Sequence, residues 1–303
     1  FVDIADEMLD NLEGNEFRRA VWTGRIPVVF REVCCTTFEH VYTLQGTTNC
    51  LFLFRHPYII RCWGIQIVKS LNLSESRVRI IFDSPDHLSL LDWIYSPQGK
   101  AEIAGTNCAA TLLEIALKIA NALEYINSQH FAYRELTLKK VSLRIEKNGE
   151  IIPKLLDMGL NHIVGREPDL VRWRPPYGYC YERFDEWMFG IFLWDLFSHA
   201  ARSLEEENSN VPIVPFAAIS DESLLPALIS GARLNQPQLC PDAVYKLIGA
   251  CTVLTPSQRP NFTVISDTLI DIMRNQNHIR KDSFLKKLCA MYNSPIYTQT
   301  RKQ

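Results

Sequence analysis

"HFAYRELTLKKVSL", residues 130–143, joins two patterns of different periodicity. The preceding stretch, "LLEIALKIANALEYINSQ", residues 112–129, carries apolar residues at helical spacing, which predicts a long amphipathic helix. The runs that follow, "VSLRI" and "IIPKLLD", turn at Asn148 and Gly149 and predict a β-hairpin. The quoted stretch is therefore a loop held between a helix and a hairpin.

The N-terminal part of the chain is rich in strand signals. Residues 20–33, "AVWTGRIPVVFREV", hold two β-rich runs divided by a Thr-Gly pair and a proline, which predicts a hairpin. The run "VRIIFDS", residues 78–84, predicts another strand. Residues 36–54 remain open between helix and strand, because their apolar spacing suits a helix while Gly46 and the β-branched residues weaken it.

From Leu88 onward the patterns are mainly helical. The stretch "DEWMFGIFLWDLFS", residues 185–198, is apolar nearly all round and predicts a buried central helix. Residues 221–231 and 241–254 predict later helices, and the polar stretch 201–210 predicts a solvated loop. A small strand-rich part is thus followed by a larger helical part, with a cleft expected where they meet.

Composition narrows the class of protein. The 32 basic and 34 acidic residues nearly cancel, so nucleic acid is not an expected partner. Nine cysteines without C-x-x-C spacing indicate reduced thiols in a cytoplasmic protein rather than a zinc site. The apolar runs are too short for a membrane span, so direct membrane insertion is not expected. Because the chain begins at Phe1, we expect it to be a segment of a longer protein.

The loop "YRELTLKKV" resembles the catalytic loop of protein kinases, whose pattern is His-Arg-Asp-Leu, four residues, then Asn. Further kinase-like motifs follow the family's order over roughly residues 12–275. They are "RHPYIIRCWGI" for the His-Pro strand entry, "LLDMGL" for Asp-Phe-Gly, "RWRPPY" for Ala-Pro-Glu, "FDEWMFGIFLWDLF" for the Asp-x-Trp helix and "SQRPNF" for the late Arg-Pro.

The resemblance implies an α+β, bilobal protein kinase-like fold with a small β-rich N-lobe and a larger helical C-lobe. The N-lobe with its hinge would cover residues 1–86 and the C-lobe residues 87–280. Residues 281–303 would be a tail or a linker to a further domain.

Several chemical positions of the family are changed. The resemblance puts Glu135 at the catalytic Asp and Lys140 at the Asn that binds Mg²⁺, where an ammonium repels the ion. Arg31 stands at the position of the strand Lys, and its planar guanidinium is not equivalent to an ammonium. The alternative is that Arg31 is an ordinary solvated strand residue. Thr47 stands at the position of the helix Glu. Of the glycine-rich loop only Gly14 matches a glycine. These changes predict an impaired or absent phosphoryl transfer.

A degenerate nucleotide site remains a candidate. Asp157 matches the Mg²⁺-binding Asp and could hold a single Mg²⁺ or only cap the local turn. Phe82 falls at the gatekeeper position, and Asp83 and Pro85 fall along the hinge. Together with Gly14 and Arg31, these residues form the candidate site. ATP is therefore a candidate ligand, not a required cofactor.

The activation segment supports the same view. Residues 158–176 contain no Ser, Thr or Tyr, so phosphorylation inside them cannot switch the domain on. Tyr177 replaces the Glu that normally pairs with the Arg matched by Arg259. We expect Arg259 to be satisfied by another carboxylate or by backbone carbonyls, because an unpaired buried guanidinium is too costly.

"SLLDWI" and the Pro-Pro of "WRPPY" are most similar to the tyrosine-kinase side of the family, and residues 231–262 to the pseudokinase domain of Janus kinases. That resemblance implies a regulatory domain that inhibits a tyrosine kinase domain in the same chain or a partner chain. A cytokine receptor would be an indirect partner, giving a cytoplasmic protein associated with a membrane through that receptor. The alternatives are an atypical kinase using Glu135 and one Mg²⁺, and a scaffold whose cleft binds neither ATP nor Mg²⁺.

Overall fold

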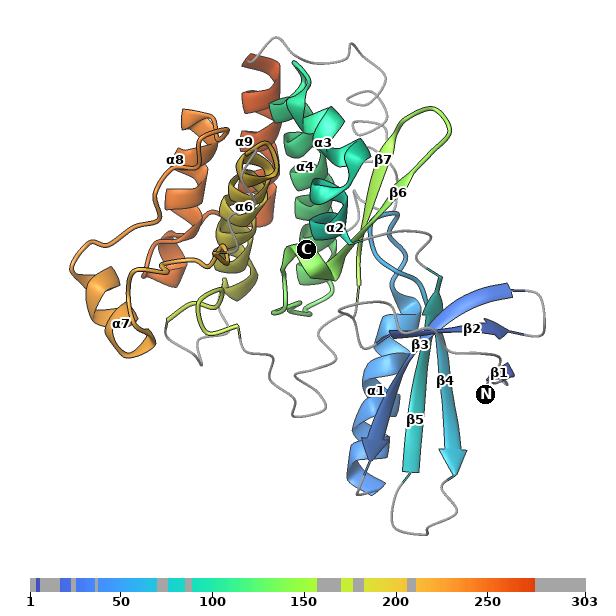
Figure 1. Cartoon of the computed structure of the whole chain (residues 1–303). Coiled ribbons are helices and arrows are strands. Elements are labelled where there is room, and N and C mark those ends of the chain that lie inside the picture. The colour runs from blue at the N-terminus through green and yellow to red at the C-terminus, as the bar shows by residue number, and fades with distance from the viewer. Residues whose placement is uncertain are drawn as a thin grey trace.

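The structure is a computed structural model in which two lobes lie side by side (Figure 1). One lobe is an antiparallel sheet covered on one face by a helix, and the other is helical and carries a short hairpin. The predicted α+β bilobal fold is therefore confirmed. The described residues are 4–5, 17–22, 26–35, 38–69, 76–84, 89–156, 170–176, 183–205 and 211–275.

The sheet lobe contains a five-stranded sheet among the described residues, in the order β1-β2-β3-β5-β4. The predicted hairpin of residues 20–33 is confirmed, since β2 and β3 pair antiparallel with Trp22 opposite Ile26. The predicted strand at residues 78–84 is also confirmed within β5. The bounds are β1 Ile4–Ala5, β2 Phe17–Trp22, β3 Ile26–Cys35, β4 Cys62–Lys69 and β5 Ser76–Asp83.

The stretch that the sequence left open between helix and strand forms α1, Phe38–Leu53. Leu44 and Leu51, two helical turns apart, are both buried against the sheet, so tertiary packing outweighs the weak local propensity. Thr48 is accommodated because its Oγ1 donates to the carbonyl of Leu44 at 2.7 Å. Nothing lies within 4 Å of a Cβ built at Gly46, so the absence of a side chain there removes no packing contact.

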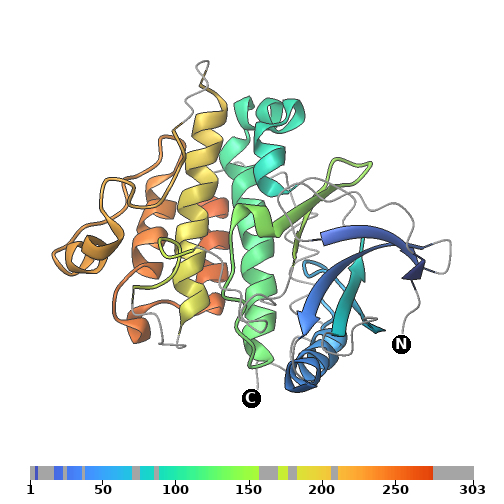
Figure 2. The same ribbon diagram turned by 60° about the horizontal axis from the view of Figure 1, so that its bottom comes forward.

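The helical lobe is built on α4 and α6. In Figure 2 these helices run beside α9, and α6 also packs on α8. The predicted long helix and the predicted buried helix are thereby confirmed. The bounds are α2 Leu90–Tyr95, α3 Pro97–Ala104, α4 Cys108–Ser128, the 3-10 turn η1 Leu138–Lys140, β6 Val141–Ile145, β7 Ile151–Leu155, α6 Phe184–Ser203, α7 Asp221–Ile229, α8 Asp242–Cys251, the 3-10 turn η2 Pro256–Gln258 and α9 Phe262–Asn275.

The predicted loop at residues 201–210 is wrong at its start. α6 continues through Ser203, which is buried and whose Oγ donates to the carbonyl of Ala200 at 2.8 Å. The buried face of the helix therefore extends one turn beyond the apolar run, although that turn reads as polar. Residues 206–210 lie outside the described part of the chain.

The two lobes are tied through the segment between α1 and β4. The N–H of Leu155 in β7 donates to the carbonyl of Tyr58 at 2.9 Å, and the N–H of Ile60 donates to the carbonyl of Leu155 at 3.0 Å. One large apolar cluster continues from the sheet face under α1 into the helical lobe. A smaller cluster lies on the outer sheet face and consists of Ala20, Val28, Phe30 and Ile81.

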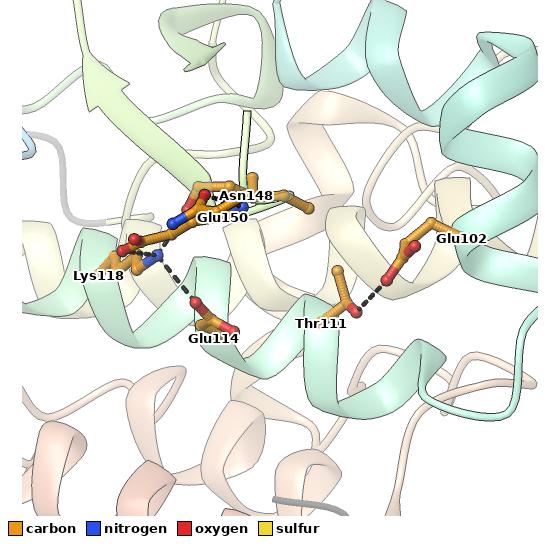
Figure 3. A network of polar contacts seen from close by, with 7 residues as sticks. Glu102, Thr111, Glu114, Lys118, Asn148 and Glu150 are labelled. Atoms are coloured by element: carbon orange, nitrogen blue, oxygen red, sulfur yellow. Dashed lines mark hydrogen bonds and ion pairs between the residues drawn. The ribbon is translucent and has the colours of Figure 1, made fainter. Parts of the chain in front are cut away.

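A cluster of charged side chains around Lys118 connects elements of the helical lobe (Figure 3). The Lys118 side chain on α4 is fully buried, and its Nζ donates to the carbonyl of Ile151 at 2.5 Å. The same Nζ lies 2.8 Å from a carboxylate oxygen of Glu114 and 3.7 Å from one of Glu150. It also lies over the Tyr58 ring, 5.8 Å from the ring centre. Lys118 thus connects α4, the start of β7 and the segment between the lobes.

No single helix in the described ranges is long and apolar enough to cross a membrane. The pair α3 and α4 satisfies the length and composition requirement only when the two are taken together across a 115° bend.

Candidate functional site

The loop at residues 130–143 is held in place by a carboxylate of α6. Asp185 accepts from the backbone N–H of Tyr133 at 2.8 Å and from that of Arg134 at 2.7 Å. These bonds hold Arg134 at a positive φ of 62°, which is uncommon for a residue other than glycine. Burial raises the pKa of the Asp185 carboxyl, while the two N–H groups and the Arg134 charge lower it. The loop conformation is therefore determined by a buried side chain from another element.

Tyr133 itself is part of the core. Its side chain is fully buried, and its hydroxyl donates to the carbonyl of Leu156 at 2.5 Å. Leu156 also donates its N–H to the carbonyl of Lys140 at 2.9 Å. The residue at the catalytic-loop His position thus connects the loop to the end of β7, next to the chain position of Asp157.

Glu135, at the position of the catalytic base, is fully buried. A carboxylate oxygen of Glu135 lies 3.9 Å from Nζ of Lys140, whose side chain is 16% exposed. A general base must lie within hydrogen-bond distance, about 2.6–3.2 Å between heavy atoms, of the group whose proton it removes. With no exposed surface, the Glu135 carboxylate is not presented to a substrate in this conformation. The carboxylate forms an ion pair with Lys140, the residue at the position predicted for the metal-binding Asn.

Arg31 in β3 is also buried, with 1% of its surface exposed. The alternation of strand residues puts it on the same sheet face as Val29 and Val33, which belong to the large apolar cluster. The alternative reading of Arg31 as a solvated strand residue is therefore wrong, because α1 covers this face of the sheet (Figure 1). Whether Arg31 contacts phosphate stays a prediction.

The hinge positions are only partly described. Phe82 is fully buried at the end of β5 and belongs to the large apolar cluster, as expected for a core aromatic. One carboxylate oxygen of Asp83 accepts from Nε1 of Trp63 at 2.7 Å, and its N–H donates to the carbonyl of Arg61 at 3.0 Å. One carboxylate oxygen and the N–H of Asp83 thus make contacts within the sheet lobe, and its role toward a ligand stays a prediction.

Other predicted site residues cannot be compared with the structure. Gly14, Pro85, Asp157 and Tyr177 lie outside the described residues. Thr47 lies within α1, but its side chain is outside the described part. Within the described ranges, no group of three or more His, Cys, Asp or Glu side chains could hold a metal ion. Asp157 therefore stays a predicted Mg²⁺ ligand.

The expectation for Arg259 is confirmed. Its guanidinium, in a residue only 3% exposed, donates to the carbonyls of Val253 at 2.9 Å, Leu254 at 3.1 Å and Arg183 at 2.9 Å. It also lies over the ring of Trp187 at 5.1 Å. Backbone carbonyls and an indole ring thus stabilise a guanidinium whose usual Glu partner is replaced in this sequence.

Sequence reasoning missed two carboxylates of α6. Asp185 positions the loop, and Asp195 accepts from Nε1 of Trp173 at 2.6 Å, which anchors the described part of the activation segment. Both are nearly fully buried. The sequence did carry a signal for them, since both are acidic residues inside a helix that is otherwise apolar all round. A buried carboxylate is costly unless it accepts hydrogen bonds, so a structural role was to be expected.

The family follows from comparison with known proteins. The family model described as protein tyrosine and serine/threonine kinase matches residues 24–269, most of the chain. The chain belongs to this family. Among curated proteins, it is similar to the high affinity nerve growth factor receptor of Gallus gallus, with 26% identity over 236 residues. The match covers 71% of this chain but only 28% of the receptor.

These findings decide the kinase family and leave the narrower resemblance open. The aligned relative is a receptor, and the resemblance to the pseudokinase domain of Janus kinases stays a prediction. Family membership does not by itself decide catalytic activity, because function depends on the residues of the site.

Proposed function

We propose that this kinase-family domain is a non-catalytic regulatory module, a pseudokinase. The observation that carries the proposal is the full burial of Glu135 beside the ammonium of Lys140. Transfer of a phosphoryl group needs a base at the substrate hydroxyl and cations on the phosphates. Here the carboxylate faces inward, and the position of a Mg²⁺ ligand carries a positive charge.

The module would regulate, most simply by inhibition, a tyrosine kinase domain in the same chain or in a partner chain. The motif resemblance to Janus kinase pseudokinase domains supports this role and would add a cytokine receptor as an indirect partner at the membrane. A cytoplasmic location and a cleft that does not require ATP belong to the same proposal. The family match over residues 24–269 supports the kinase-family fold on which this proposal rests.

The alternative is a weak kinase in which Glu135 is the base and Asp157 binds one Mg²⁺. It would require the Glu135 carboxylate to leave the interior and its contact with Lys140. A misplacement of about 1 Å can already reduce the rate about a hundredfold, which disfavours this alternative. A scaffold that binds neither ATP nor Mg²⁺ is a third reading, and it differs from the proposal only in the cleft.

The regulatory role is tested with the natural full-length protein. Tyrosine phosphorylation would be measured for the full-length protein and for a version lacking residues 1–280. We expect the deletion to raise phosphorylation at least about fivefold, because coupling free energies of 1–3 kcal/mol correspond to factors of about 5–150. Unchanged phosphorylation, or a full-length protein that neither contains nor co-purifies with a tyrosine kinase domain, would contradict the regulatory role.

A further inference from the structure

Three arginines surround one carboxylate on the outer face of the sheet. Glu32 on β3 lies between two neighbouring strands, with Arg18 on β2 and with Arg77 and Arg79 on β5. Strand alternation places Glu32 on the face opposite Arg31, which points to the side covered by α1. The group is therefore separate from the candidate nucleotide site.

The contacts within this group are unequal. Nε of Arg79 donates to Glu32 at 2.9 Å, and both side chains are about one-tenth exposed. The nearest guanidinium nitrogens of Arg18 and Arg77 lie 3.9 and 3.6 Å from the other carboxylate oxygen, beyond hydrogen-bond distance. These two side chains are 43% and 52% exposed. Within the described part of the chain, neither donates a hydrogen bond.

Two guanidinium groups of this set share a carboxylate that is already engaged. Among the described residues, Arg18 and Arg77 lie within ion-pair distance of Glu32 alone, and Glu32 also accepts a hydrogen bond from Arg79. The next strand, β4, places Gln66 opposite Arg79 and Val68 opposite Arg77, so its described residues add no compensating acid. A phosphoryl group carries about −1.5 to −2 charges at neutral pH and accepts bidentate hydrogen bonds from Arg, which suits the two exposed guanidinium groups of Arg18 and Arg77.

The surroundings favour a phosphate that is carried on a peptide. The outer face continues from the arginines into the small apolar cluster, where half-buried Trp22 and Trp63 pack with their ring centres 5.4 Å apart. Arg18 and Trp22 lie on one strand face four residues apart, which corresponds to about 13 Å. A peptide of a few residues can span that distance and use both surfaces.

We propose that Arg18, Arg77 and Arg79 form a docking surface for a phosphorylated peptide segment of a partner protein. The two exposed guanidinium groups contact the phosphoryl oxygens, and Arg79 and Glu32 hold them in position. The indole rings contact an apolar side chain of the same segment. The surface does not depend on the catalytic state of the cleft.

The test uses the whole chain and a fluorescently labelled peptide of about ten residues, one phosphotyrosine flanked by Ala and Leu, in an anisotropy titration. Two exposed charge-assisted contacts predict that Arg18→Gln combined with Arg77→Gln weakens binding at least about tenfold. Arg274→Gln is the matched control, because Arg274 is 57% exposed and pairs only with Asp271 at 3.3 Å among the described residues. Its affinity should stay within about twofold of wild type.

Further titrations test whether the surface recognises the phosphoryl group itself. The unphosphorylated peptide and a peptide with Glu at the phosphotyrosine position should bind at least about tenfold more weakly. Equal binding of the Glu peptide, equal affinity of the double variant, or no binding by wild type would each overturn the proposal. Binding of phosphatidylserine vesicles in preference to the peptide would overturn it as well. If the double variant is unstable, Arg77→Gln alone replaces it in the titration, because this side chain is more than half exposed and its removal should not disturb the fold.

Discussion

The protonation of Asp195 is expected to affect the stability of the folded protein. One of its oxygens accepts from Trp173 at 2.6 Å, while the other is buried without a hydrogen-bond partner among the described residues. Burial raises the pKa of this carboxyl to about 7, although the hydrogen bond from Trp173 lowers it. In the unfolded chain the pKa would be about 3.9. Above pH 7 the folded protein must therefore keep a charged carboxylate in its interior.

The direction of the pH effect follows from proton linkage. Between the two pKa values the folded state binds a proton that the unfolded state has lost, so stability rises as pH falls from about 7 toward 4. Asp195→Asn keeps an acceptor for Trp173 and removes the titration. We expect the variant to be the more stable protein near pH 8, with the difference shrinking or reversing near pH 5, a change of about 1–3 kcal/mol.

The measurement is urea unfolding of both proteins at the two pH values. Asp185 and Glu186, whose carboxyl pKa values burial also raises, are present in both proteins and cancel in the difference. A difference in stability that does not change with pH would show that Asp195 is not protonated in the folded state near neutral pH.

At the level of elements, α6 approaches the end of α8 closely at Gly190. A Cβ at this position would lie 2.7 Å from Cβ of Cys251 and 2.9 Å from a methyl carbon of Thr252. Gly190→Ala should therefore push the two helices apart and destabilise the protein by about 1–3 kcal/mol. Thermal or urea unfolding measures the effect.

Gly249 on α8 provides the matched control. Nothing lies within 4 Å of a Cβ built there, and alanine favours a helix by up to about 1 kcal/mol over glycine. Gly249→Ala should be neutral or stabilising. Equal effects of the two substitutions would contradict the close approach of α6 and α8.

The Lys118 cluster joins α4 to the hairpin within the helical lobe (Figure 3), and Lys118 also lies over the ring of Tyr58. Lys118→Met fills a similar volume but removes the donor to Ile151 and the charge between Glu114 and Glu150. We expect a loss of about 2–3 kcal/mol, below the usual range for a broken buried pair because both carboxylates are about one-third exposed.

Thr111→Ala is the control in the same region. It removes one partly buried hydrogen bond from Thr111 to Glu102, 3.0 Å long, and should cost about 1 kcal/mol or less. Urea unfolding compares the two variants. A loss for Lys118→Met no larger than that for Thr111→Ala would indicate that the ammonium does not hold the elements together.

For the whole molecule, periodicity predicted the elements where apolar pattern and packing agree. The helix at residues 112–129 and the hairpin turning at Asn148 and Gly149 are examples, and Gly149 has a positive φ of 81° as that turn requires. α1 was ambiguous because only tertiary burial decides it. The end of α6 was misplaced because a polar sequence there is still partly buried.

The sequence predicted which residues belong to the candidate site but not how their side chains are arranged. Motif spacing located Glu135 and Lys140, yet no pattern indicates that one carboxylate is buried and lies 3.9 Å from the ammonium. The contact depends on the loop, and the loop depends on Asp185 from a helix 50 residues later. Contacts of that range form through the fold, so sequence spacing alone does not encode them.

The central claim is that this kinase-family chain does not transfer phosphate. The most direct measurement is transfer of labelled phosphate from ATP, with Mg²⁺, to a tyrosine peptide and to the domain itself. We predict that wild type shows no signal above Asp157→Asn, which removes the single candidate metal ligand. Transfer above that control, lost again in Glu135→Gln, would show that the buried carboxylate becomes accessible and would contradict the claim.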